Sequence, residues 1–135
     1  MDADQGPVWL TPETIIDINT EVVNASGERH LLRDRGLLEG AVARPQNKHL
    51  YESEADVVSL AFILLLAIAQ NHPFEQGNKR TAFLAALEML KLNGYDFEAP
   101  DSETLGEIIE GAISGGFYDE DEFIEMMREF VVSSG

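Results

Sequence analysis

The residues most able to do chemistry lie in one short run, HPFEQGNKR, at positions 72–80. It opens with His72, and histidine is the side chain best suited to accept a proton near neutral pH. Gly77 lets a ligand approach the backbone, and the three residues after it supply an amide and two cations. If a helix begins here, its free N–H groups form an anion site. The run therefore predicts a phosphate-bearing ligand beside a proton acceptor.

Two of the chain's nine basic residues, Lys79 and Arg80, fall together at this point. The helix dipole favours cations at C-termini, whereas these two come at the expected start of a helix. Their position is easier to explain if a phosphate is the missing counter-ion. Taken without the rest of the run, both are also compatible with ordinary surface charges.

Two helices are expected to position this run. Residues 57–69 (VVSLAFILLLAIA) contain a single polar residue, and they are too short for the ~20 residues of a membrane span. A helix that is apolar all round is then the buried centre of a bundle. Ser53 and Asp56 have the spacing of a capping box that would open it. Residues 81–92 predict the second helix, closed by Asn93 and Gly94.

Four other helices complete the predicted fold, each preceded by a residue that can cap a helix N-terminus. The expected spans are 12–25, 35–44, 102–114 and 120–132, with N-caps at Thr11, Asp34, Asp101 and Asp119. The second is expected to end before Pro45, so that residues 44–52 form a loop or a short extended hairpin. About six helices with little strand predict an all-α bundle.

Composition limits the classes of function. The chain has 135 residues, which favours a single domain, and no cysteine, which excludes disulfides and thiolate metal sites. Its formal charge of −16 argues against binding to nucleic acid or to an anionic membrane. The acidic start lacks the basic region of a secretory signal, so we expect a soluble, cytoplasmic protein. From Gly94 onward there are twelve acidic residues and a single basic one, Arg128. They form either a solvated face or a binding surface for a basic partner.

The run at 72–80 resembles the signature loop of the Fic/Doc family. The broad Fic form is His-x-Phe-x-(Asp/Glu)-Gly-Asn-Gly-Arg-x-x-Arg, and the death-on-curing (Doc) branch has Asn-Lys-Arg and lacks the last Arg. Here Lys79 and Arg80 follow the asparagine, and Phe83 stands where the last Arg would be. The sequence therefore resembles the Doc branch. The similarity covers roughly residues 9–130 and includes Leu10–Glu13, Arg33–Glu39, Ala43–Gln46 and Leu92–Gly94.

This resemblance implies a single Fic/Doc-like domain over 1–135, a compact bundle with a short flap loop or hairpin. His72 would take the proton from an attacking hydroxyl, and Phe74 would anchor the loop in the core. The phosphates of ATP would be held by Gly77, Asn78, Lys79 and Arg80. Residues 46–51 fall where the family has a flap that aligns the target by strand addition, although a plain connecting loop is equally compatible. Possible target contacts there are Asn47, Lys48 and His49.

Gln76 departs from the family pattern. The family has an acidic residue at this position, which binds a Mg²⁺ ion that bridges the phosphates. An amide oxygen can ligate Mg²⁺ but carries no negative charge. Weak metal binding, slow turnover, an altered nucleotide and loss of catalysis are therefore all open.

The resemblance implies transfer of a group from ATP to a protein hydroxyl. Fic enzymes generally transfer AMP, whereas the Doc branch is associated with transfer of the terminal phosphate to a Thr of elongation factor Tu, which stops translation. Lys79 and the missing last Arg favour the phosphoryl transfer of a Doc-like toxin. AMP transfer, and a non-catalytic binding module with Gln76 as its cause, remain the alternatives.

The sequence also bears on how an active toxin would be inhibited. Many Fic proteins carry an inhibitory helix with a (Ser/Thr)-x-x-x-Glu-(Gly/Asn) signature, and no Ser or Thr of this chain begins such a match. An active toxin would then need an antitoxin supplied in trans, with a segment that folds as a helix in a groove of the bundle.

Overall fold

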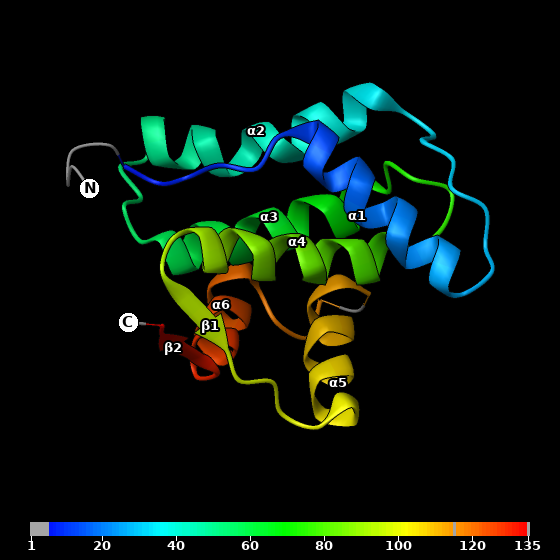
Figure 1. The fold of residues 1–135 in the computed structure, drawn as a ribbon. Coiled ribbons are helices and arrows are strands. Elements are labelled where there is room, and N and C mark those ends of the chain that lie inside the picture. Colours follow the sequence, from blue (N-terminus) through cyan, green and yellow to red (C-terminus); the bar gives the residue numbers. More distant parts are fainter. Residues whose placement is uncertain (1–5, 115, 135) are drawn as a thin grey trace.

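Six helices and one two-stranded sheet form the regular structure of residues 6–114 and 116–134, the part of the chain that this computed structural model describes (Figure 1). The predicted all-α class and the number of helices are confirmed. None of the described helices is long and apolar enough to cross a membrane. The elements are α1 (Pro12–Ala25), α2 (Arg35–Tyr51), α3 (Val57–Asn71), α4 (Asn78–Leu92), β1 (Tyr95–Phe97), α5 (Ser102–Ile113), α6 (Glu120–Arg128) and β2 (Val131–Ser133).

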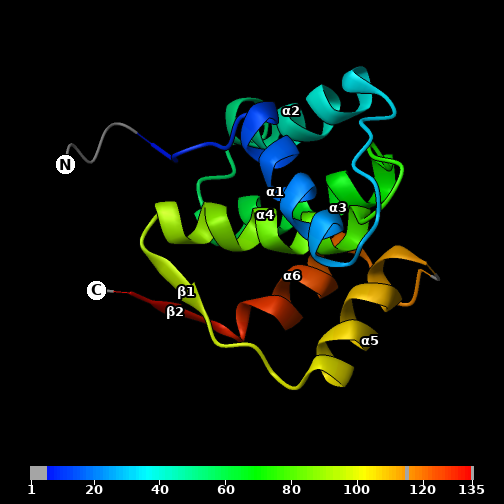
Figure 2. The same ribbon diagram turned by 45° about the vertical axis from the view of Figure 1, so that its right-hand side comes forward.

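Helix α3 is the centre of the bundle, as its apolar sequence predicts. Every residue from 58 to 69 is buried. It packs between α2 and α4, and α5 and α6 cover it from below in the view of Figure 1. Seen from the second direction, α1 lies across α4 on the side away from α6 (Figure 2). The chain thus leaves the C-terminal end of α3 and returns along α4 after residues 72–77, which fixes the place of the loop between the two helices.

The start of α3 differs from the prediction. The N-cap is Asp56, whose Oδ1 accepts the N–H of Val58 at 3.1 Å, and not Ser53. Ser53 has a left-handed φ of 59° and lies before the helix. Asp56 is held in place by Ser59, which donates to its Oδ2 at 3.0 Å, and by an ion pair with Arg128 of α6. The spacing of residues 53–56 could not reveal this contact with Arg128.

The expected end of the second helix before Pro45 is wrong, and so is the loop or hairpin at 44–52. Helix α2 continues through Pro45 to Tyr51. A proline inside a helix removes one backbone hydrogen bond. It is tolerated here because Leu38, Ala41, Val42 and Pro45 form one buried stripe of α2. Packing of that stripe against α3 outweighs the local preference.

The C-terminal part also contains strand that was not predicted. Helix α6 ends at Arg128 instead of continuing to 132, and Val131–Ser133 pair antiparallel with Tyr95–Phe97. The ring of Phe97 lies edge-on to Phe62 and Phe130, with centroids 6.2 Å and 5.8 Å apart. This aromatic contact gives the short sheet an apolar face on the bundle.

The Asp56–Arg128 pair makes the stability of the fold depend on pH. Burial raises the pKa of Asp56, but hydrogen bonds from Arg128, Ser59 and Val58 outweigh it and leave the pKa below its ordinary value. Asp56→Asn keeps a capping side chain and removes the charge, so we expect a loss of about 1 kcal/mol at neutral pH. A lowered pKa stabilises only the ionised form, so the difference between variant and wild type should vanish as the pH falls through it.

Urea unfolding of both proteins from neutral to acidic pH measures this difference. Asp17→Asn, which changes an exposed carboxylate of α1, is the matched control. A difference for Asp56→Asn that is independent of pH would contradict the prediction.

Candidate functional site

The loop between α3 and α4 is shaped by two residues in the left-handed region. His72 ends α3 with a φ of 50°, and its N–H donates to Ile68 O at 3.2 Å. Gly77 precedes α4 with a φ of 75°, and a Cβ there would meet Val23 of α1 at 3.0 Å. Glycine is thus required by backbone angle and by the close approach of α1. A left-handed histidine is uncommon and marks a backbone that its surroundings hold in place.

The predicted start of the second helix at 81 is three residues late. Helix α4 begins at Asn78, so Lys79 and Arg80 lie in its first turn. No side chain caps this N-terminus. The N–H groups of the first turn and the two cations therefore lie together at the start of α4.

Asn78 closes the loop on itself. Its Oδ1 accepts the N–H of Phe74 at 3.0 Å, and its Nδ2 donates to Phe74 O at 2.8 Å. The ring of Phe74 is buried in the core, 1% exposed, as expected of an anchor. The amide of Asn78 thus fixes the shape of the loop, a role that the sequence did not indicate beside the expected phosphate contact.

An extended segment, residues 31–33, lies along the loop. Leu32 pairs antiparallel with Phe74, the N–H of Arg33 donates to Pro73 O at 2.8 Å, and the N–H of Glu75 donates to Leu31 O at 3.0 Å. The guanidinium of Arg33 donates to His72 O, with its Nε 3.0 Å away. This segment was not predicted as part of the site, because its contacts with the loop are mostly made by the backbone.

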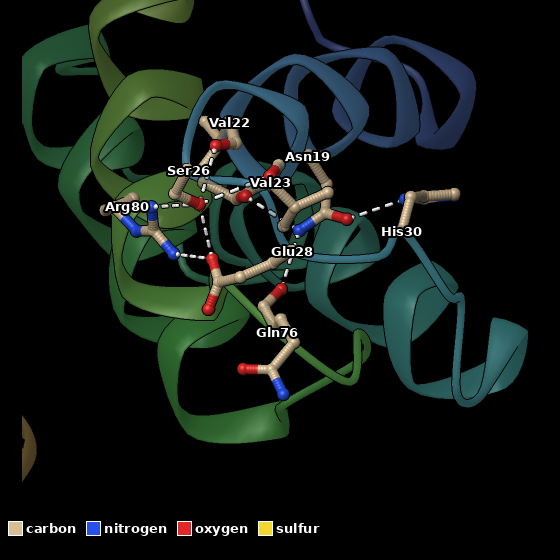
Figure 3. A network of polar contacts seen from close by, with 9 residues as sticks. Asn19, Val22, Val23, Ser26, Glu28, His30, Gln76 and Arg80 are labelled. Atoms are coloured by element: carbon tan, nitrogen blue, oxygen red, sulfur yellow. Dashed lines mark hydrogen bonds and ion pairs between the residues drawn. The ribbon is translucent and has the colours of Figure 1, made fainter.

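The loop is also tied to α1 by a buried asparagine (Figure 3). Asn19 Nδ2 donates to Gln76 O at 2.9 Å and to Thr81 Oγ1 at 3.1 Å. Its Oδ1 lies 2.7 Å from Nδ1 of His30. Asn19 is fully buried and was missed, although the sequence carried a signal: a polar residue stands on the same face as Ile15 and Val23.

A hollow of about 420 Å³ opens where these elements meet. The structure thus brings together all the predicted site residues of the motif except Phe74, which is buried in the core. One lining residue, Glu28 of the α1–α2 connection, was not predicted. The hollow is lined by Glu28, His72, Gln76, Gly77, Asn78, Lys79 and Arg80.

Both cations of the hollow already have carboxylate partners within the chain. Arg80 Nη2 lies 2.5 Å from Glu28 Oε1, which also accepts from Ser26 at 2.6 Å (Figure 3), and Lys79 Nζ lies 2.5 Å from Glu110 of α5. The expected missing counter-ion is therefore supplied internally. Hydrogen bonds from Ser26 and Arg80 lower the pKa of Glu28, and the bond from Lys79 lowers that of Glu110. Such exposed pairs contribute little to stability.

The donors in the hollow do not make a site for a resident metal ion. Among the described residues no group of three or more His, Cys, Asp or Glu side chains could hold one. Mg²⁺ in nucleotide sites takes one or two carboxylates and otherwise phosphate oxygens and water. Glu28 offers a carboxylate and Gln76 an exposed amide oxygen. This set fits a Mg²⁺ ion that arrives on the phosphates of a nucleotide.

The predicted flap does not lie at this site. Asn47, Lys48 and His49 form the last turns of α2, and Lys48 pairs with Glu120 of α6 at 3.0 Å. The end of α2 next to the loop is near Leu37, whose O accepts from Asn71 Nδ2 at 3.0 Å. Lys48 is eleven residues farther along, about 16 Å at 1.5 Å per residue. The segment beside the loop is residues 31–33.

Comparison with known proteins agrees with this architecture. A sequence model of the Fic/DOC family matches residues 9–90, which include the loop, α1 and all lining residues of the hollow. The chain is 31% identical over 106 residues to "Protein kinase doc" of Escherichia phage P1, covering 78% of this chain and 82% of that protein. It is 38% identical over 94 residues to "Toxin Doc" of Mycolicibacterium smegmatis, covering 66% and 72%.

Asn19→Ala tests the hydrogen bonds by which α1 holds the loop. The change leaves Thr81 and the backbone of Gln76 without a donor, so we expect the free energy of unfolding to fall by about 2 kcal/mol. Urea unfolding measures it. Asn24→Ala, the same substitution at an exposed position of α1, is the control. Equal losses for the two variants would show that the buried hydrogen bonds of Asn19 contribute nothing.

Proposed function

The chain belongs to the Fic/DOC family, and on that premise we propose that it is a Doc-like toxin that phosphorylates a protein. It transfers the terminal phosphoryl group of ATP to a Ser or Thr hydroxyl of its target. By resemblance the target is translation elongation factor Tu, and the modification stops translation. The observation that carries the proposal is the meeting of His72, Lys79 and Arg80 in one hollow at the free N-terminus of α4. One relative is named a protein kinase and another a toxin.

The phosphates bind at the first turn of α4. Its uncapped N–H groups and the positive end of the helix dipole favour an anion there. Lys79 and Arg80 exchange their carboxylate partners for phosphate oxygens. Gly77 keeps the backbone open to the ligand. Gln76 and Glu28 would be the protein donors to a Mg²⁺ ion bound with the nucleotide, and that ion would neutralise part of the phosphate charge.

His72 acts as the general base. Its side chain is exposed at the hollow, while Arg33 and the left-handed backbone fix its position. The target hydroxyl oxygen forms a bond to the terminal phosphorus, the bond from that phosphorus to the bridging oxygen breaks, and the hydroxyl proton passes to His72. The products are the phosphorylated protein and ADP.

Residues 31–33 are the best placed to align the target. Alternate backbone groups of an extended segment point to opposite sides, so those of Leu32 face away from the loop while its neighbours bond to it. We propose that the target adds a strand to this free edge and brings its hydroxyl to His72. This replaces the flap expected at 46–51.

An antitoxin supplied in trans completes the proposal. One relative is named as a toxin, and a chain that carries this activity needs a neutralising partner when it is produced. We expect expression of the chain alone to arrest growth. Co-expression of a neighbouring small protein should relieve the arrest.

The base role of His72 is tested by intact-mass analysis of elongation factor Tu after incubation with the protein, ATP and Mg²⁺. We expect a phosphate-sized gain in mass that His72→Ala abolishes. His49→Ala, which changes a histidine at the far end of α2, should retain it. An AMP-sized gain would establish adenylyl transfer instead, and no adduct with ATP binding intact would favour a non-catalytic module.

The effect of the missing acidic residue is tested by Gln76→Asp. Its side chain is exposed, so the fold should tolerate the change. A carboxylate is a stronger Mg²⁺ ligand than an amide, and we expect ATP affinity in Mg²⁺ to rise by about tenfold, with little change in a chelator. Titration calorimetry measures both conditions. Gln76→Asn, which shortens the side chain without adding charge, should show no gain, and equal gains in both variants would contradict a metal contact here.

A further inference from the structure

A second hollow, separate from the one at His72, lies on helix α5. It has a volume of about 440 Å³, and none of its described lining residues is basic. Its walls come from one face of α5 and from the connection that follows this helix. We name it the α5 hollow, and it is lined by Glu107, Glu110, Gly111, Ser114, Phe117 and Tyr118. Figure 1 shows α5 beneath α4, on the far side of it from α1.

The α5 hollow has an exposed aromatic wall on a fixed backbone. The side chain of Phe117 is 80% exposed, yet its N–H donates to Gly111 O at 3.1 Å. The ring of Tyr118 packs on the same turn of α5, because a Cβ at Gly111 would meet its Cε2 at 2.5 Å. Exposed aromatic side chains are enriched where proteins bind one another. The fixed ring of Phe117 is therefore suited to anchor a partner.

The charge around the hollow determines which partner fits it. Glu107 and Glu110 are exposed carboxylates three residues apart on one face of α5. They belong to the part of the chain from Gly94 onward, which has twelve acidic residues and one basic residue. A partner that fills the hollow must therefore carry positive charge. Arginine fits best, because its planar guanidinium pairs with carboxylates and also stacks on aromatic rings.

Glu110 connects the α5 hollow with the hollow at His72. Its Oε2 lies 2.5 Å from Nζ of Lys79, which lines the hollow at His72. Its Oε1 accepts a hydrogen bond from Oγ of Ser114, which lines the α5 hollow. Both side chains of the Lys79–Glu110 pair are about half exposed, so the pair is weak. One carboxylate is thus within reach of both hollows.

We infer that the α5 hollow binds an arginine-bearing segment of a partner protein. The guanidinium pairs with Glu107 and Glu110 and lies against the ring of Phe117. It competes with Lys79 for the carboxylate of Glu110, so docking weakens the pair between these two residues. Such coupling is reciprocal, and removal of Lys79 should strengthen docking. That a freed Lys79 then serves the phosphates of the nucleotide rests on the proposed function, whereas docking does not.

The test measures binding of a dye-labelled Arg-Leu-Arg-Leu-Arg peptide to the full chain by fluorescence anisotropy. The control peptide has citrulline, an uncharged analogue of the same shape, in place of each arginine. We expect wild type to bind the arginine peptide about tenfold more tightly than the control peptide, because charged hydrogen bonds to the carboxylates are lost in the control.

Two variants of the hollow have matched controls elsewhere. Phe117→Ala should weaken binding of the arginine peptide about tenfold, and Glu107→Gln about threefold. Tyr51→Ala removes another highly exposed aromatic ring, at the end of α2, and Glu129→Gln removes an exposed charge after α6. Both controls should bind like wild type. All four altered side chains are exposed, so the variants should fold, and circular dichroism checks this.

The link through Glu110 is tested by Lys79→Met. We expect this variant to bind the arginine peptide about threefold more tightly than wild type, because Glu110 has lost its competing cation. Lys91→Met removes the same charge from an exposed position in the last turn of α4 and should show no such gain. The comparison separates the local effect from the change in net charge.

Each other outcome overturns a defined part of the inference. If wild type does not bind the arginine peptide, binds both peptides equally, or binds no better than Phe117→Ala, the docking surface is overturned. If Lys79→Met binds no better than Lys91→Met, the link through Glu110 is overturned. No nucleotide is present in these measurements, so failure of the proposed phosphoryl transfer would leave their results unchanged.

Discussion

The two hydrogen bonds between the side chain of Asn78 and the backbone of Phe74 close the loop on which the whole site depends. They hold the chain as it turns from α3 into α4, with the Phe74 ring buried beneath. Residues 58–69 of the central helix α3 are buried, and the Phe74 ring attaches the loop to the same close-packed core. His72 and the start of α4 are therefore fixed relative to one another by packing, before any ligand is present.

The fixed turn also determines where the charges of the site lie. The chain as a whole is strongly acidic, yet the turn places two cations at the positive end of a helix. Glu28 and Glu110 neutralise them from different parts of the chain, one from the α1–α2 connection and one from α5. In the proposed function a phosphate replaces each carboxylate, because the pairs are exposed to water and weak. The cations are thus kept near the hollow in a chain whose net charge repels anions.

The sequence predicted what short-range patterns determine. The apolar run of α3, the caps at Thr11, Asp34, Asp101 and Asp119, and the motif between two helices were all found as expected. Apart from the start of α4, which was placed three residues late, the failures have one cause, which is contact between distant residues. Pro45 stays helical because its face packs on α3, and Asp56 replaces Ser53 as a cap because Arg128 holds it. The sheet at 95–97 and 131–133 likewise depends on packing between distant aromatic rings.

The same distinction separates the predicted part of the site from the part that was missed. The motif residues are contiguous, so their types and spacing reveal them. Asn19 reaches the loop from α1, whereas Glu28 and residues 31–33 come to the site through the path of the chain after α1. That path lies against the loop on one side, and α5 lies on the other side of the two cations. In the proposed phosphoryl transfer, a target held at residues 31–33 and a nucleotide held at the two cations would lie on opposite sides of the reacting phosphorus, because the attacking hydroxyl and the leaving diphosphate must lie in line across it.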